Sequence, residues 1–263
     1  MTIQEALRTS SVDAREARLL LAAATGFSEA ALVAYPEREL PAETQERFQD
    51  FVRRRKTGEP AAYILGHKEF YGLELAVNPA VLIPRPETEL LVDLSLQREF
   101  SSAVDLGTGS GAIALALKRM RPKARVVAVE ASAAALVVAQ RNAVKHGLEI
   151  EFRHGRWFEP LAGERFDLIV ANPPYVAEGD AHLADLGFEP RGALVSGPDG
   201  LDAIREIARG APRHLSPGGW LLLEHGMGQD SPVRALLSQA GLEDVESCPD
   251  LARIPRVAGA RLK

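Results

Sequence analysis

The chain is poor in the residue types that build disulfide frameworks and thiolate metal sites. Its 263 residues include one cysteine, Cys248, which excludes an internal disulfide and a zinc site made of several thiolates. His67 and His225 lack the spacing of a metal-ligand pair, so we predict no metal site. A single cysteine also suits a reducing compartment, and we expect a cytoplasmic protein.

Long apolar runs and an excess of positive charge are missing as well. The most apolar early stretch, residues 19–35, is interrupted by Gly26 and Glu29 and is too short to cross a bilayer. The first residues lack the basic and apolar regions of a signal peptide. A formal net charge of -5 argues against a protein that mainly grips bare nucleic acid, although it permits a local basic patch. We expect neither a membrane nor a direct nucleic-acid partner.

The first quarter of the chain carries helical signals only. Asp13 and Glu16 have capping-box spacing, and Ser28 can cap a second helix. Pro41 opens a third helix, whose apolar residues recur at positions 48, 51 and 52. We predict a small helical bundle over residues 1–68. A β-hairpin linker is expected over 69–84, because polarity alternates from residue 69 and an apolar run follows an Asn-Pro turn.

A helix is expected to open at residues 84–89 and run through Leu96, and from about residue 100 onward strands alternate with helices. The candidate strands are 103–106, 125–130, 149–153, 166–171 and 220–224, with two short ones near Val245 and Val257. This alternation is typical of a parallel sheet with helices on both faces, which binds ligands at the carboxyl ends of its strands. We therefore predict an α/β fold, with a seven-stranded Rossmann-like sheet in the domain 85–263.

A glycine-rich turn follows the first strand of this sheet. Glycines there let the backbone bend sharply and approach a ligand closely. Glu130 ends the second strand, where a carboxylate can accept both hydroxyls of a ribose. The pattern predicts a nucleoside cofactor, but a nicotinamide dehydrogenase satisfies the same G-x-G-x-x-A spacing. The residues expected to bind the cofactor in the turn are Asp105, Gly107, Thr108, Gly109, Ser110 and Gly111.

Two features favour S-adenosyl-L-methionine over a dinucleotide. Asp105 places negative charge where a dinucleotide would bring its phosphates, and this charge suits a cofactor with ammonium and sulfonium groups. Trp157, with Phe158 beside it, follows the third strand and can cover an adenine ring; a core aromatic is the alternative interpretation. We expect methyl transfer, with S-adenosyl-L-homocysteine as the product.

Asn172-Pro173-Pro174-Tyr175 closes the apolar strand 166–171. Proline fixes its own φ and biases the preceding residue toward extended backbone, so the Asn172 amide is held outward. The Asn172 side-chain oxygen and the Pro173 carbonyl suit the protons of a planar amino group, with Tyr175 stacked on its face. A strand simply stopped by prolines is the alternative. We predict that all four residues bind substrate and that Asn172, Pro173 and Tyr175 are catalytic.

The quartet is accompanied by LIPRPETE at 82–89, FEP at 188–190, GPDGL at 197–201 and LEHG at 223–226. Together with the helical N-terminus and the hairpin, these segments resemble the release factor glutamine N5-methyltransferases, a class I S-adenosylmethionine-dependent family. The resemblance covers nearly the whole chain. Glu130 stands where an aspartate is more usual in this family, but the longer carboxylate can still reach a diol.

The resemblance implies methylation of the glutamine in the Gly-Gly-Gln motif of peptide chain release factors, on its side-chain nitrogen N5, which tunes translation termination. It implies that the helical domain recognises the substrate, and that residues 107–111, Glu130 and Trp157 hold the cofactor, with Asn172 near its methionine part. Arg85 and Glu87 lie in a loop expected to reach the pocket, where they shape it or form a structural salt bridge. We expect a monomer, because one active site serves one protruding loop.

The main alternative is an adenine-N6 DNA methyltransferase, whose target amino group can use the same grip. Such an enzyme needs a basic recognition region and a way to flip the base. Residues 1–75 hold ten Lys and Arg against twelve Asp and Glu, which disfavours a DNA clamp. A dehydrogenase or a cofactor-binding regulatory module leaves the quartet unexplained. The basic run 53–56 is interpreted as a solvated helix end or, alternatively, as a contact for an acidic face of the release factor.

Overall fold

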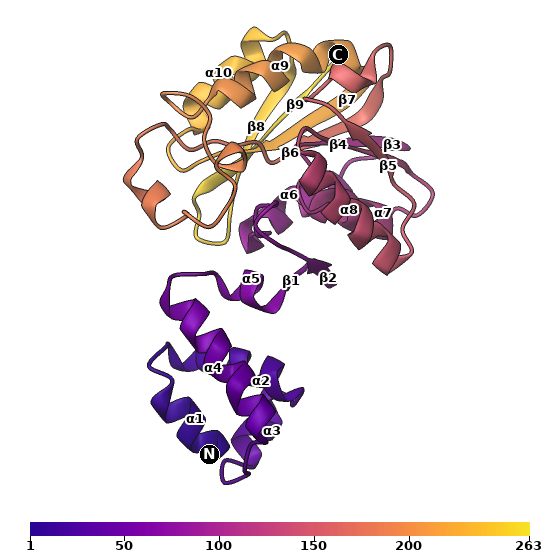
Figure 1. The fold of residues 1–263 in the computed structure, drawn as a ribbon. Helices are drawn as coiled ribbons and strands as arrows, with labels where there is room; N and C mark the ends of the chain where they lie inside the picture. The colour runs from indigo at the N-terminus through magenta and orange to yellow at the C-terminus, as the bar shows by residue number, and fades with distance from the viewer. The chain divides into compact units, whose positions relative to one another are not determined.

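The structure is a computed structural model that describes all residues, 1–263, in two units, Met1–His67 and Lys68–Lys263. The N-terminal unit is helical, and α1 begins at a capping box between Thr2 and Glu5. Phe48 of α4 and Leu20 of α2 share one buried core, as the apolar spacing predicts. The helices, coloured from indigo to violet in Figure 1, are α1 (Ile3–Thr9), α2 (Ala14–Thr25), α3 (Glu29–Ala34), α4 (Ala42–Lys56) and α5 (Ala61–Leu65).

The β-hairpin is shorter than the expected 69–84. Its strands are β1 (His67–Phe70) and β2 (Leu73–Ala76). The turn lies at Tyr71 and Gly72, whose φ values of 52° and 72° are both positive, as a type I′ hairpin turn requires. The apolar run after Asn78 forms no strand, because a tight turn, closed by a 3.1 Å hydrogen bond from Val81 N–H to the Asn78 carbonyl, leads into an irregular loop.

The second unit holds the predicted seven-stranded sheet, with strand order β5-β4-β3-β6-β7-β9-β8. The first five strands in that order are parallel, whereas β9 runs antiparallel to β7 and β8 antiparallel to β9. The α/β fold class is therefore confirmed. The strands are β3 (Ser102–Leu106), β4 (Arg125–Glu130), β5 (Glu151–His154), β6 (Phe166–Ala171), β7 (Leu215–Glu224), β8 (Glu243–Pro249) and β9 (Pro255–Arg261).

Helices cover both faces of the sheet, as Figure 1 shows. Val104 and Leu106 of β3 belong to a buried core shared with α9 and α10, whereas Ala103 belongs to a second core shared with α6 and α7. Alternate residues of one strand thus enter opposite layers, which explains its continuous apolar sequence. The helices are α6 (Glu89–Leu96), α7 (Ala112–Met120), α8 (Ala133–His146), α9 (Asp202–His214) and α10 (Asp230–Gln239). Short 3₁₀ turns are Pro86–Thr88, Glu159–Leu161, Ala181–Ala184 and Arg191–Ala193.

The order of the strands brings two distant motifs together. The chain winds outward from β3 to β4 and β5 on one side, then returns to place β6 on the other side. Such a switch point leaves a crevice at the carboxyl ends of the strands. Leu106 pairs with Ala171 in the β3–β6 register, so Gly107 and Asn172 are the next residues on neighbouring strands.

Candidate active site

A cavity of about 650 Å³ lies at the carboxyl ends of β3, β4 and β6, a size typical of small-molecule sites. The predicted site residues that line it are Gly107, Thr108, Gly109, Ser110, Glu130, Trp157, Asn172 and Pro174. Those that do not line it are Asp105, Gly111, Phe158, Pro173 and Tyr175. The cavity therefore unites the glycine-rich turn with the asparagine of the quartet.

The glycine-rich turn adopts backbone angles that other residues rarely reach. Gly107 has a φ of 76° and Gly109 a φ of 56°, and the N–H groups of Gly107 and Thr108 both donate to the Val129 carbonyl. Gly111 instead serves packing, because a Cβ there would come within 3.3 Å of Ala139 Cβ on α8. Gly111 does not line the cavity, and in the structure it lets α7 and α8 approach; that it binds the cofactor stays a prediction.

Glu130 is held by two backbone donors at the edge of the cavity. Gly109 N–H donates to its Oε2 at 2.9 Å, and Ser132 N–H donates to its Oε1 at 2.8 Å. Each carboxylate oxygen accepts more than one hydrogen bond, so both can still receive a ligand hydroxyl. The side chain is thus oriented before any ligand arrives.

Asp105 is fully buried behind the cavity wall. Its Oδ2 accepts hydrogen bonds from Thr108 Oγ1 at 2.6 Å and from Ala114 N–H at 3.2 Å, while Oδ1 has no partner. Burial raises the pKa of the Asp105 carboxyl to about 7, and the nearby Glu130 charge adds to the rise. A buried carboxylate oxygen without a donor is costly when it is ionised, which favours the protonated carboxyl.

The two aromatic residues after β5 point to different places. Trp157 lines the cavity with a left-handed φ of 47°, and its buried Nε1 has no hydrogen-bond acceptor. Phe158 stacks on His214 instead, with ring centroids 4.6 Å apart and planes 12° from parallel. Phe158 packs against the core around α9 and does not line the cavity, which gives no support to the prediction that it binds the cofactor.

Asn172 is oriented by two residues that sequence reasoning missed as site residues. Its Nδ2 donates to Thr88 Oγ1 at 3.0 Å, and Thr88 Oγ1 donates to Glu224 Oε2 at 2.7 Å. Thr88 is 4% exposed and Glu224 is 2% exposed. Both lie in segments that carry the family resemblance, LIPRPETE and LEHG, and this was the only signal in the sequence.

Tyr175 does not present its ring to the cavity. Its hydroxyl donates to Glu224 Oε1 at 3.1 Å, and burial raises the pKa of the phenol, with the Glu224 charge adding to the rise. Pro173 is buried, while Pro174 lines the cavity. Tyr175 is absent from the cavity lining and bonds the buried Glu224, so its stacking on a substrate amide stays a prediction.

A buried glutamate fastens the loop before α6. Glu189 accepts a 3.0 Å hydrogen bond from Ile83 N–H and forms an ion pair with Arg85, which lines the cavity. Both alternatives for Arg85, a structural salt bridge and a pocket-shaping residue, are therefore realised together. Beside Trp157, Arg156 makes a two-point ion pair with Glu206 at 3.0 and 2.7 Å, and both of these side chains also line the cavity.

Two family models match the chain, the PrmC N-terminal domain over residues 2–66 and the methyltransferase small domain over residues 86–186. A release factor glutamine methyltransferase of Xylella fastidiosa (strain Temecula1) is 50% identical to it, covering 97% of this chain and 96% of that protein. One of Burkholderia pseudomallei is 49% identical, covering 99% of this chain and 96% of that protein. One of Pseudomonas aeruginosa is 49% identical, covering 92% and 90%.

Solved structures share the fold at lower identity. A methyltransferase from Pyrococcus furiosus is 18% identical with a TM-score of 0.58, covering 80% of this chain and 96% of that one. The 16S rRNA N2 G1207 methyltransferase of T. thermophilus, in complex with AdoMet and guanosine, is 24% identical with a TM-score of 0.57, covering 75% of this chain and 50% of that one. These similarities establish the fold. No helix here is long and apolar enough to cross a membrane.

Proposed function

This chain belongs to the release factor glutamine methyltransferase family, and we propose that it methylates the side-chain nitrogen N5 of the glutamine in the Gly-Gly-Gln motif of peptide chain release factors, which tunes translation termination. The observation that carries the proposal is the Leu106–Ala171 register, which puts Asn172 beside the glycine-rich turn in one cavity. A methyl acceptor and a nucleoside cofactor can meet there.

The cavity fits S-adenosylmethionine by its size and by its chemistry. Gly107 and Gly109 let the backbone approach the ligand, and Glu130 would accept the ribose hydroxyls. The ring of Trp157 would face the adenine, and the charge of the ionised Asp105, acting through the cavity wall, would favour the cationic end of the cofactor. When bound, the cofactor supplies a methyl group on a sulfonium, which is a strong electrophile.

The protein's own task is to orient a poor nucleophile. The lone pair of an amide nitrogen is delocalised into its carbonyl, so the nitrogen must be aligned with care. We assign the two acceptors for its N–H groups to Asn172 Oδ1 and the Pro173 carbonyl. They also stabilise positive charge as it develops on nitrogen, an effect of about 2.7–4 kcal/mol per preorganised group. The methylated nitrogen is acidic enough to lose its proton to water without a general base.

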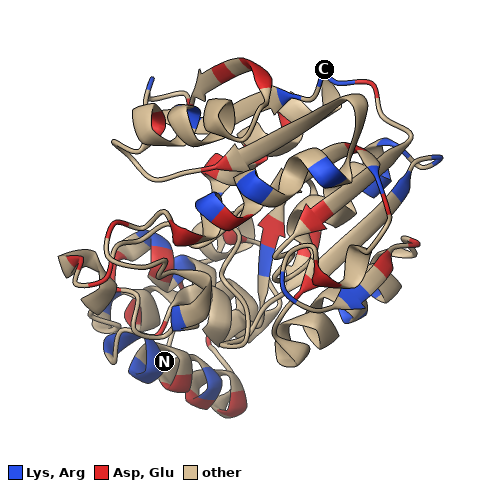
Figure 2. Cartoon of the chain, turned by 90° about the horizontal axis from the view of Figure 1, so that it is seen from above, with Lys and Arg blue, Asp and Glu red and all other residues tan.

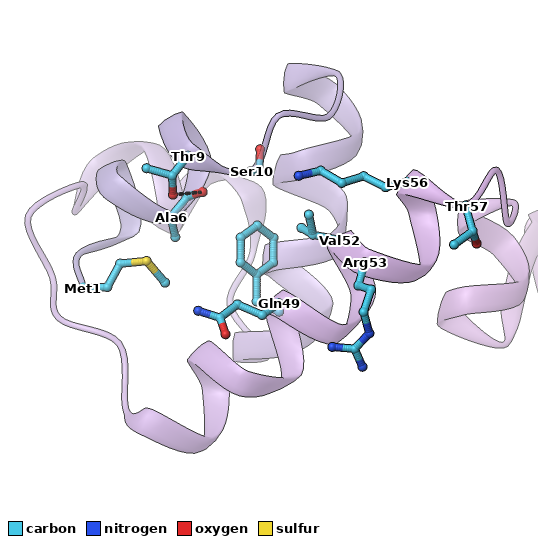
Figure 3. Close-up of a pocket in the computed structure, with 10 residues that line it drawn as sticks. Met1, Ala6, Thr9, Ser10, Gln49, Val52, Arg53, Lys56 and Thr57 are labelled. Atoms are coloured by element: carbon cyan, nitrogen blue, oxygen red, sulfur yellow. Dashed lines mark hydrogen bonds between the residues drawn. The ribbon is translucent and has the colours of Figure 1, made fainter.

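The N-terminal unit is the proposed recognition domain for the release factor. Its helices α1 and α4 border a cavity of about 580 Å³ with an apolar lining that includes Ala6, Phe48 and Val52. Arg53 and Lys56 also line this cavity, as Figure 3 shows, which suits a partner surface with apolar and acidic groups. Charges of both signs are mixed along the helices, as Figure 2 shows, and this supports a protein partner over nucleic acid. The proposed enzyme is a cytoplasmic monomer.

One labelling experiment tests the proposed function against its main alternative. The protein is incubated with methyl-labelled S-adenosylmethionine and either a release factor or DNA, and the label is located by mass spectrometry. We expect label on the glutamine amide, and none on a release factor whose Gly-Gly-Gln glutamine is replaced by asparagine. Label on adenine would establish the adenine-N6 DNA methyltransferase instead, and label on neither substrate would refute both functions.

A further inference from the structure

Two buried side chains, Thr88 and Glu224, form one hydrogen-bonded network with Asn172 and Tyr175 of the quartet. Glu224, at the end of β7, accepts from Thr88 Oγ1 at 2.7 Å and from Tyr175 OH at 3.1 Å. Thr88 in turn accepts from Asn172 Nδ2 at 3.0 Å. Thr88 and Glu224 are 136 residues apart in the sequence, so only the folded sheet brings them together.

The single hydroxyl proton of Thr88 gives the network a direction. An ionised carboxylate can only accept hydrogen bonds, so the Thr88 hydroxyl must donate its one proton to Glu224. The Thr88 oxygen can then only accept a hydrogen bond from Asn172. Asn172 is therefore obliged to turn Nδ2 toward Thr88, which leaves Oδ1 on the other side of its amide. Asn172 lines the cavity, so the oxygen is the atom left for a ligand there.

We propose that Glu224 and Thr88 are positioning residues for methyl transfer, which fix the Asn172 amide so that its oxygen faces the acceptor nitrogen. This inference rests on the proposed function. With a neutral Glu224, the carboxyl group can donate to Thr88, and Thr88 can then donate to a flipped Asn172. A flipped Asn172 would present its NH2 group to the NH2 group of the substrate, and two donors do not bind each other.

The charges around Glu224 determine the pH at which the Asn172 amide changes its orientation. Burial raises the pKa of the Glu224 carboxyl, and the hydroxyls of Thr88 and Tyr175 oppose the rise. Arg256 on β9 also lowers this pKa, whereas Glu87 beside Thr88 raises it. The folded protein therefore presents the reactive Asn172 orientation at higher pH and loses it as Glu224 gains a proton.

The first test removes the link and keeps the shape. Thr88→Val replaces the hydroxyl by a methyl group, and we expect kcat to fall roughly 100-fold from misorientation of the acceptor. The dissociation constant of S-adenosylhomocysteine should not change. Thr88→Ser retains a hydroxyl and should recover most of the lost rate. Ser95→Ala is the matched control, because it removes a buried hydroxyl in the adjoining helix α6 that bonds only the Leu91 carbonyl.

The second test monitors the orientation of the Asn172 side-chain amide by NMR in the cofactor-free protein. The side-chain amide signals of Asn172, assigned by their loss in Asn172→Ala, should move with pH in the wild type and stay constant in Thr88→Val and Glu224→Gln. The fall of kcat toward low pH should vanish in the same two variants. Wild-type kcat in Thr88→Val, or an Asn172 titration that persists in it, would overturn the inference. A wild-type enzyme that labels no glutamine would refute the proposed function instead.

Discussion

The ring of Trp157 lies against Gly107, so close that a Cβ on this glycine would be 3.1 Å from Cζ3 of the indole. Gly107 also has a φ of 76°, a conformation in which a side chain is strained in any surroundings. Glycine is therefore needed at position 107 for two reasons: the backbone is left-handed there, and a side chain would collide with the Trp157 ring that lines the cavity.

Gly107→Ala should destabilise the protein and weaken cofactor binding together. We expect the left-handed backbone alone to lower the free energy of unfolding by about 1–2 kcal/mol. Displacement of Trp157 should raise the dissociation constant of S-adenosylhomocysteine, measured by calorimetry. Gly147→Ala is the control, because Gly147 has a φ of 62° and no atom near its absent Cβ. It should show the loss of stability without the loss of affinity.

Asn172→Ala should abolish methyl transfer and leave cofactor binding largely intact. The variant loses the acceptor that orients the glutamine nitrogen, and it keeps the turn at 107–111 and Glu130. Single-turnover transfer and S-adenosylhomocysteine affinity should be measured on the same preparation. Wild-type turnover in this variant would refute the proposed role of Asn172.

Glu130→Ala should do the reverse and raise the dissociation constant of the cofactor. The variant loses the proposed ribose acceptor and also frees the Gly109 and Ser132 N–H groups that this carboxylate now holds. Glu130→Asp, which restores the residue more usual in the family, should keep most of the affinity. An unchanged dissociation constant in Glu130→Ala would count against the diol contact.

Cofactor affinity should rise with pH through about 7 because of Asp105. Burial raises the pKa of this carboxyl from 3.8 to about 7, so it is protonated below neutrality and ionised above it. A cationic ligand prefers the ionised form, and affinity should fall as the pH falls below 7, by less than tenfold per pH unit because Asp105 does not contact the cavity. Titration calorimetry from pH 5.5 to pH 8.5 measures this trend, and Asp105→Asn should bind weakly with no such slope.

The raised pKa of Asp105 has the opposite effect on the stability of the cofactor-free protein, which should fall as the pH rises. A carboxyl group whose pKa is higher in the folded state holds its proton more tightly there than in the unfolded chain. The stability that this proton contributes is fully present below about pH 4 and is lost as pH rises through about 7. Urea unfolding of wild type and Asp105→Asn across this range isolates the contribution of Asp105.

Lys56→Glu should weaken recognition of the release factor without affecting the cofactor. Lys56 lines the cavity between α1 and α4, where we place an apolar and acidic surface of the partner. We expect KM for the release factor to rise and the dissociation constant of S-adenosylhomocysteine to stay constant. Lys123→Glu, an exposed position in the other unit, makes the same change in net charge and should leave KM as it is. Equal KM values in the two variants would argue against this docking surface.

Local sequence signals predicted most of the fold. The strand boundaries of β4 and β6 agree with expectation, because apolar runs and glycine-rich turns act within a few residues. The observed hairpin differs from the expected range 69–84 because its turn depends on positive φ values at Tyr71 and Gly72. The alternating polarity of the sequence does not indicate where this turn lies. For a non-glycine residue such as Tyr71, the surrounding fold decides this conformation.

The sequence by itself determined the chemistry of the site: a glycine-rich turn after β3, an acid at the end of β4 and an Asn-Pro-Pro-Tyr stop after β6. These features depend on turn geometry and side-chain type, which the local chain carries. Only the tertiary structure decided where the side chains point, with Phe158 on His214, Tyr175 on Glu224, and Thr88 between Glu224 and Asn172. The physical reason is that a buried hydroxyl or amide bonds whichever partner the packed strands bring within about 3 Å, and that partner lies far away in the sequence.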